Sequence, residues 1–242
     1  MTILSIGNSF SQDAQRYLSG IAHAAGEDIL CVNPFIGGCS LWAHYRNILS
    51  DAKSYSLEFC GRTTGFQVSL NEALLARNWD VVTIQQCSPE SIHYDSFQPY
   101  LSAISEHVRK FCPKAKQMIH QHWAYGAASE RLPKMGFSGY DDMFAVVKAN
   151  YDRAAKEIGA EVMPSGEVIG ELLRLGADPL KVHRDCHHIG YGLGRYAVGL
   201  LWFAVLTGKP VRDNSFRDFD QPISEEEVAL AKTAVENVLA RI

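Results

Sequence analysis

Two kinds of hydrophobic pattern alternate along the chain. Short apolar runs that stop at glycine or polar residues predict buried parallel strands at residues 3–6, 29–32, 80–86, 117–120 and 161–163. Longer segments, in which apolar residues recur every three or four positions, predict helices at residues 11–26, 41–49, 70–75, 98–111, 140–158, 190–206 and 224–240. Residues 55–60 and 65–68 predict a hairpin.

The order of these elements predicts the fold class. Strands alternate with helices throughout, and neither an internal repeat nor a linker interrupts them. This order is typical of βαβ units, so we expect an α/β fold, a three-layer α/β/α sandwich with a mostly parallel sheet of flavodoxin-like type, forming a single domain over residues 1–242. Ligands of such sheets bind beyond the carboxyl ends of the strands. The loops expected there are residues 7–11, 37–40, 85–91 and 120–126.

Composition narrows the class of protein further. The composition, 47% hydrophobic and 21% charged residues, is typical of a globular protein. A chain of 242 residues is long enough to bury a core that needs no disulfides or bound metals for stability. A net charge of −4, without a long Lys/Arg run, argues against nucleic acid or an anionic membrane as partner. No apolar run approaches the ~18 residues of a membrane span.

The start of the sequence and its cysteines bear on the compartment. The first residues show neither the basic region nor the apolar core of a signal peptide. We therefore expect a cytoplasmic protein, unless a signal peptide has been removed. The six cysteines show no C-x-x-C spacing, so we expect mostly free thiols.

The first loop of the expected site carries a serine directly after a strand. In Gly7-Asn8-Ser9, a tight turn from strand to helix exposes the hydroxyl of Ser9 and its backbone N–H, as a nucleophile requires. The same position also suits a helix N-cap, a role open to Ser9 or Ser11. This segment alone does not separate the two interpretations.

A second segment, near the C-terminus, pairs a carboxylate with histidines. Asp185 precedes His188 by three residues in a loop that leads into a helix, so the carboxylate can orient the imidazole as a general base for Ser9. Asp185 can instead cap the following helix, and His187 and His188 can be ordinary surface residues. His187 competes with His188 for the role of base.

Together these motifs resemble the SGNH (GDSL-like) hydrolases. The resemblance rests on Gly-Asn-Ser9-Phe, Gly37-Gly38-Cys-Ser-Leu and the Asp185-x-x-His188 spacing, in that order. The longer phrases IGNSFSQDA, WDVVTIQQ and GRYAVGLLWFAVLTG resemble a bacterial branch of this superfamily, the DUF4886 domain, over about residues 3–210. The resemblance implies a serine esterase with an SGNH-hydrolase fold.

The resemblance also implies roles for individual residues. Ser9 matches the nucleophile, Asp185 and His188 match the other two members of the triad, and the backbone N–H groups of Ser9 and Gly38 match the oxyanion hole. Many members carry G-x-N-D in the third motif, where the asparagine amide is a further donor. This chain has Gln85-Gln86-Cys87 there, and we expect Gln86 to replace the asparagine, with Gln85 or Ser88 as alternatives.

Aromatic residues and further histidines complete the expected site. We expect Trp42, Trp123, Tyr125 and His187 to line the substrate pocket, although aromatic residues in loops more often only pack. His120 and His122 stand at alternate positions of a predicted strand and thus face the same way, so with Asp185 and His187 they form a possible metal site. We favour the interpretation without metal, because the metal site gives Ser9 and Gly38 no role.

The sequence therefore predicts an esterase that needs no cofactor and acts on O-acetyl or other short acyl esters, on a carbohydrate by analogy with the superfamily. Two alternatives stay open. The first is a metal-dependent hydrolase that uses the histidine and aspartate set. The second is a non-catalytic carbohydrate-binding module on an esterase fold.

Overall fold

The computed structural model describes all 242 residues, and the chain divides into two compact units. The first unit comprises residues 1–12, 29–121 and 148–163, and the second comprises residues 13–28, 122–147 and 164–242. Two helices contribute residues to both units, α1 (Ser9–Gln15) and α7 (Tyr140–Ile158).

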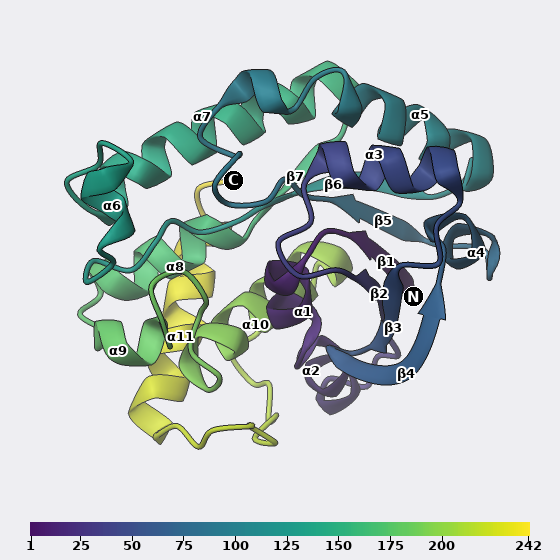
Figure 1. Ribbon diagram of the computed structural model, residues 1–242. Helices are drawn as coiled ribbons and strands as arrows, with labels where there is room; N and C mark the ends of the chain where they lie inside the picture. Colours follow the sequence, from purple (N-terminus) through teal and green to yellow (C-terminus); the bar gives the residue numbers. More distant parts are fainter. The chain divides into compact units, whose positions relative to one another are not determined.

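The first unit is built on a seven-stranded sheet with the order β4-β3-β2-β1-β5-β6-β7 (Figure 1). Neighbouring strands from β2 through β1 and β5 to β6 are parallel, whereas β3 and β4 form an antiparallel hairpin at one edge. The strands are β1 (Thr2–Ile6), β2 (Leu30–Phe35), β3 (Tyr55–Phe59), β4 (Arg62–Val68), β5 (Val81–Ile84), β6 (Lys116–Gln121) and β7 (Glu161–Pro164). Each predicted strand is confirmed to within three residues.

Helices of the first unit flank this sheet. They are α3 (Leu41–Ser50), α4 (Leu70–Leu75), the short 3-10 helix η1 (Tyr94–Ser96) and α5 (Tyr100–Phe111). The side chains of Leu101, Ile104 and Val108 form the buried stripe of α5, as the spacing predicts. Figure 1 shows α3 and α5 side by side, and residues of the two helices are in contact. The predicted mostly parallel α/β fold is confirmed.

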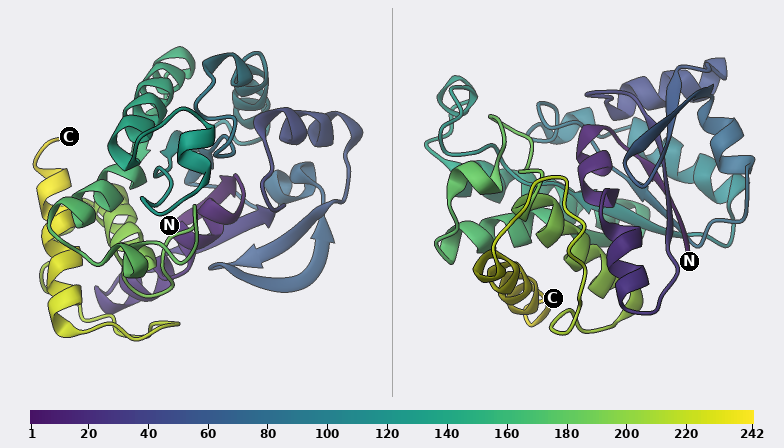
Figure 2. Two further views of the ribbon diagram at one scale, coloured as in Figure 1. Left: turned by 60° about the vertical axis from the view of Figure 1, so that its left-hand side comes forward. Right: turned by 90° about the horizontal axis from the view of Figure 1, so that it is seen from below.

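The second unit consists mainly of helices packed around α10. These are α2 (Leu18–Ala24), α6 (Arg131–Lys134), α8 (Ser165–Arg174), α9 (Pro179–Val182), α10 (Leu193–Thr207) and α11 (Glu225–Leu239). Almost every residue of α10 is buried, and the helix packs against α2, α8, α9 and α11, the last of which is yellow in Figure 2. A Cβ atom on Gly199 would lie 2.8 Å from the Ile21 side chain, so glycine lets α10 approach α2 closely. No helix combines the length and apolar character that crossing a bilayer requires.

One predicted helix is divided in the structure, and three helices were not predicted: α8 and the short α6 and α9. The helix expected over residues 11–26 is divided into α1 and α2 at Arg16 and Tyr17, whose side chains are held by Asp220 and by the carbonyl of Tyr191. Helix α8 contains two glycines, Gly166 and Gly170, and glycine is a poor helix former. Packing against α10 and α11 therefore outweighs the weak helix propensity of this segment.

Candidate functional site

Three loops at the carboxyl ends of β1, β2 and β5 are tied together by side-chain amides. The Asn8 amide donates to the carbonyl of Cys39 at 3.2 Å, which joins the first loop to the second. The Gln85 amide donates to Asn8 Oδ1 at 3.3 Å, and its oxygen accepts from the hydroxyl of Ser11 at 2.8 Å. The predicted convergence of these three loops is thus present within the first unit.

Gly7 and His44 fix the turn that carries Ser9. A Cβ atom on Gly7 would lie 2.1 Å from Ser11 Oγ and 2.8 Å from Gln85 Oε1, so no other residue fits there without a shift. Nε2 of the buried His44 lies 3.0 Å from the Gly7 carbonyl, and its Nδ1 lies 3.0 Å from the Tyr55 hydroxyl. Burial lowers the pKa of His44 to about 4, so the ring is neutral and donates from Nε2. This positioning role of His44 was not predicted from the sequence.

Ser9 and Gly38 occupy accessible positions on this framework. Ser9 is the first residue of α1 and is half-buried, between the buried side chains of Asn8 and Phe10. Gly38 is exposed, with a φ of 61° and open space beside its Cα. Trp42 follows in the first turn of α3 and is 48% exposed. Solvent therefore reaches all three residues.

Gln86 does not fit the expected role of oxyanion donor. Its side-chain nitrogen donates to the carbonyl of Ser96 at 3.0 Å and to the Ser96 hydroxyl at 3.1 Å. Its oxygen accepts from the backbone N–H of Leu41 at 3.0 Å and of Cys87 at 2.8 Å. Because both amide hydrogens are already used inside the protein, the expectation of an oxyanion donor is corrected. Gln86 instead holds its own loop against Ser96 and the start of α3.

The second unit brings Asp185 and His188 together in one short loop. An antiparallel bridge between His183 and Ile189 closes the loop, and the Arg184 N–H donates to the His188 carbonyl at 3.0 Å. Asp185 Oδ2 lies 2.8 Å from His188 Nδ1. Asp185 Oδ1 accepts from the backbone N–H groups of His187 at 2.8 Å and His188 at 2.7 Å. The carboxylate thus sets both the fold of the loop and the orientation of the ring.

The charge state of this loop follows from the same contacts. Partial burial opposes ionisation of Asp185, but the N–H groups of His187 and His188 and the His188 ring outweigh it and hold the pKa of the carboxyl well below its usual range. Burial, and next the neighbouring His188, lower the pKa of His187 to about 4. Its Nδ1 lies 3.0 Å from Cys186 Sγ and 3.5 Å from Asp185 Oδ1. His188 is therefore the histidine that the carboxylate directly orients.

Trp123 and Tyr125 support this loop from beneath. The indole N–H of Trp123 donates to the His187 carbonyl at 2.8 Å, and the Tyr125 ring centroid lies 5.6 Å from that of His187. Trp123 is 0% exposed and Tyr125 is 1% exposed, so neither ring offers a face on which a sugar can stack. The expectation that they contact substrate is corrected, because both rings pack under the loop.

A buried ion network anchors the other side of the loop. Asp13, in α1, is fully buried and accepts from Arg184 Nη1 at 2.9 and 3.0 Å and from Arg195 Nε at 2.8 Å. Arg184 also donates to the Ile189 carbonyl, and Arg195 Nη1 donates to Asp220 Oδ2 at 2.8 Å. Asp13 therefore connects the loop of Asp185 to α1 and α10.

Replacing Asp13 by asparagine is expected to lower the free energy of unfolding by about 3–5 kcal/mol, because two arginines then share a buried site without a carboxylate. Chemical denaturation at pH 7 measures this loss. Asp220→Asn is the control, since Asp220 is 28% exposed and water can replace its contacts. A loss for Asp13→Asn no larger than that of the control would contradict the expectation.

The expected metal set is only partly assembled. Asp185 and His187 gather with His188, rather than with His120 and His122, so that one ligand atom from each of the three lies within 4.8 Å of the others. Strand β6 ends at Gln121, so His122 lies beyond the strand and the alternation that predicted a histidine pair does not reach it. His122 Nδ1 instead lies 2.6 Å from the Trp123 carbonyl.

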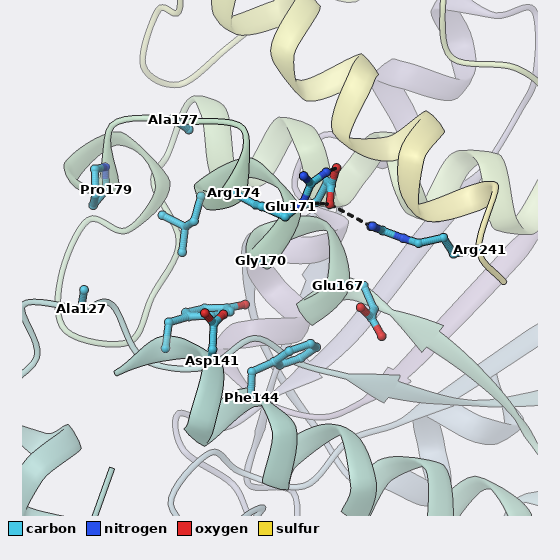
Figure 3. Close-up of a pocket in the computed structure, with 12 residues that line it drawn as sticks. Ala127, Asp141, Phe144, Glu167, Gly170, Glu171, Arg174, Ala177, Pro179 and Arg241 are labelled. Carbon is cyan, nitrogen blue, oxygen red and sulfur yellow. Dashed lines mark hydrogen bonds and ion pairs between the residues drawn. The ribbon is translucent and has the colours of Figure 1, made fainter. Parts of the chain in front are cut away.

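An open cavity of about 660 Å³ lies elsewhere in the second unit, and none of its lining residues belongs to the Asp185 loop (Figure 3). Glu171 in its wall is 3% exposed and accepts from Arg174 Nε at 2.9 Å, Asn237 Nδ2 at 2.6 Å and Arg241 Nη2 at 2.9 Å. These partners, Arg174 foremost, outweigh burial and lower the pKa of Glu171 to about 2. The cavity wall is thus held by a structural ion network.

This network makes stability depend on pH. A carboxyl whose pKa is lowered by folding stabilises the protein above its unfolded pKa of about 4.5, and that contribution is lost as the pH falls toward 2. We expect Glu171→Gln to be less stable than the wild type by about 1–3 kcal/mol at pH 7. The difference should narrow by about 1 kcal/mol at pH 4. Denaturant titrations at both pH values test this, with the exposed Asp141→Asn as control; a difference independent of pH would contradict it.

Comparisons with known proteins agree with this architecture. The model of the family DUF4886, a domain of unknown function, matches residues 2–238. A solved DUF4886 family protein from Bacteroides uniformis is 30% identical with a TM-score of 0.90, over 99% of this chain and 95% of that one. No curated protein matches the sequence.

More distant structures share the fold. A candidate SGNH hydrolase from Slackia heliotrinireducens has a TM-score of 0.61 at 21% identity, over 85% of this chain and 98% of that one. An acetylxylan esterase from Geobacillus stearothermophilus has a TM-score of 0.53 at 14% identity, over 89% and 94%. The chain therefore belongs to the DUF4886 family and has the α/β fold of the SGNH hydrolases.

Proposed function

We propose that the protein is a serine esterase in which Ser9 is the nucleophile, His188 the general base and Asp185 the residue that orients the base. The Asp185–His188 pair carries this proposal. Oδ2 holds Nδ1 at 2.8 Å, which turns Nε2 away from the carboxylate, the arrangement in which a histidine takes a proton from a serine. The two backbone hydrogen bonds to Oδ1 keep the carboxylate in that orientation.

The reaction then follows the acyl-enzyme route. Ser9 Oγ attacks the ester carbonyl as its proton passes to His188 Nε2, and the backbone N–H groups of Ser9 and Gly38 donate to the developing oxyanion. Collapse of the tetrahedral intermediate expels the alcohol, which takes the proton from His188. Water, activated by the same base, releases the acid. Two backbone donors serve in this scheme, since Gln86 is committed to Ser96.

A short acyl ester on a carbohydrate is the substrate class we propose. Trp42 is 48% exposed and follows Gly38 by four residues. The guanidinium of Arg46 lies 4.9 Å from its ring centroid and covers one face, which leaves the other face of the indole for a sugar ring. Acetylxylan esterases are among the proteins with the same fold, which supports an acetyl group by analogy. The proposed chemistry needs no cofactor.

The test is covalent labelling with a fluorophosphonate, followed by mass mapping of the modified residue. We expect a single adduct, on Ser9, that forms on the folded protein and not on the heat-denatured one. An adduct on any other residue would remove Ser9 from the role of nucleophile.

A further inference from the structure

Four consecutive residues of the Asp185 loop each carry a side chain that binds metals: Asp185, Cys186, His187 and His188. The ligand atoms of the aspartate and the two histidines all lie within 4.8 Å of one another. The two histidines approach different oxygens of the carboxylate: His188 Nδ1 is 2.8 Å from Asp185 Oδ2, and His187 Nδ1 is 3.5 Å from Asp185 Oδ1. The three side chains are 43%, 23% and 19% exposed in chain order, so an ion can enter from solvent.

These separations are close to those that zinc requires. With bonds of about 2.0–2.2 Å to nitrogen and oxygen, the ligands of a tetrahedral zinc ion lie about 3.3–3.5 Å apart. Small side-chain movements bring the three ligand atoms, which lie within 4.8 Å of one another, to that spacing. Cys186 Sγ lies 3.0 Å from His187 Nδ1, which adds a soft sulfur donor next to the ion. Imidazole and thiolate favour zinc over magnesium or calcium, which prefer oxygen ligands.

The loop is also held in shape before any ion arrives. The His183–Ile189 bridge closes its base, and Arg184 is fixed by the buried Asp13. The backbone carbonyls of Cys186 and His187 accept from the Gly126 N–H at 3.1 Å and the Trp123 indole at 2.8 Å. A pre-organised loop loses little conformational freedom when it binds a metal, and outer contacts of this kind orient metal ligands.

We propose that Asp185, His187 and His188 form a zinc site and that zinc bound there inhibits the enzyme. The inhibitory part rests on the proposed esterase function, whereas the binding site does not. When zinc bonds to His188 Nδ1, the proton of that nitrogen moves through solvent to Nε2, so the neutral ring loses the lone pair that accepts the proton of Ser9. Asp185 exchanges its hydrogen bond to the ring for a bond to the metal.

The experiment titrates metal-depleted full-length protein with zinc against a chromophoric chelator, and measures hydrolysis of 4-nitrophenyl acetate in parallel. We expect one zinc ion per chain and a rate that falls with the same half-saturation as binding. A hundredfold higher concentration of magnesium should leave the rate unchanged. Absence of zinc binding would overturn the site. Zinc that raises the rate would overturn inhibition and favour a metal-dependent hydrolase.

A variant locates the ion. His187→Gln removes one ligand, so we expect its zinc affinity to fall at least tenfold. The zinc concentration that halves its hydrolysis rate, measured against its own zinc-free rate, should rise at least tenfold as well. His93→Gln, which removes an exposed histidine of the first unit, is the control and should bind zinc as the wild type does. Equal affinity in wild type and His187→Gln would place the ion elsewhere and reject the site. Binding that depends on His187, in a protein with no esterase activity, would support the site and reject the proposed function instead.

Discussion

Replacing Ser9 by alanine is expected to lower kcat for a short-chain nitrophenyl ester by about 10⁴-fold or more, with the fold intact. The variant keeps the backbone N–H of residue 9 and the Gly38 loop, so we expect it to retain substrate binding and the proposed oxyanion donors. It has no atom that can form the acyl-enzyme. Steady-state hydrolysis, corrected for the background reaction with surface side chains, gives the rate, and circular dichroism gives the fold.

Ser11→Ala is the matched control for that measurement. Ser11 lies two residues after Ser9 in the first turn of α1, and its hydroxyl donates to Gln85 at 2.8 Å. Loss of this hydrogen bond loosens the loop without removing the nucleophile, so we expect a loss of activity of about tenfold or less. Wild-type activity in Ser9→Ala would show that Ser9 is not the nucleophile. Absence of activity in the wild type would instead favour the non-catalytic carbohydrate-binding module.

The strands were predictable because the parallel strands at the centre of the sheet are buried on both faces. Such strands are continuous apolar runs, and residues 3–6 and 81–84 are buried throughout. The positions of the loops followed from the same pattern, since a parallel sheet gathers its ligand-binding loops at the carboxyl ends. Asp185 and His188 were predictable as a pair because their spacing lies within one short loop.

Partners that are distant in sequence were not predictable in this way. Nothing local shows that the Gln86 amide meets Ser96, or that Trp123 is buried beneath residue 187. The same holds for Asp13. Its neighbours in the sequence are mostly polar, and nothing local shows that the carboxylate is buried and paired with Arg184 and Arg195.

Replacing Asp185 by asparagine is expected to lower kcat by about 10⁴-fold, with little change in KM. The pKa of Asp185 lies below its usual range, so the carboxylate is ionised at neutral pH. In the proposed mechanism it stabilises the positive charge that His188 acquires in the transition state. Asparagine keeps the size of the side chain but loses that charge. With the asparagine oxygen in place of Oδ1, which accepts from two backbone N–H groups, the amide group faces His188 Nδ1 and cannot accept its proton.

A purely structural role for Asp185 makes a different prediction. If the carboxylate only folds the loop, the loss of activity in Asp185→Asn should follow the loss of stability, and phosphonate labelling of the folded fraction should proceed at the wild-type rate. If the carboxylate orients and stabilises the base, labelling should slow along with hydrolysis, while the unfolding midpoint moves only a few degrees, the shift that follows from the loss of about 1 kcal/mol. The rate of labelling measured on folded protein therefore separates the two roles, and a wild-type rate would remove Asp185 from the catalytic scheme.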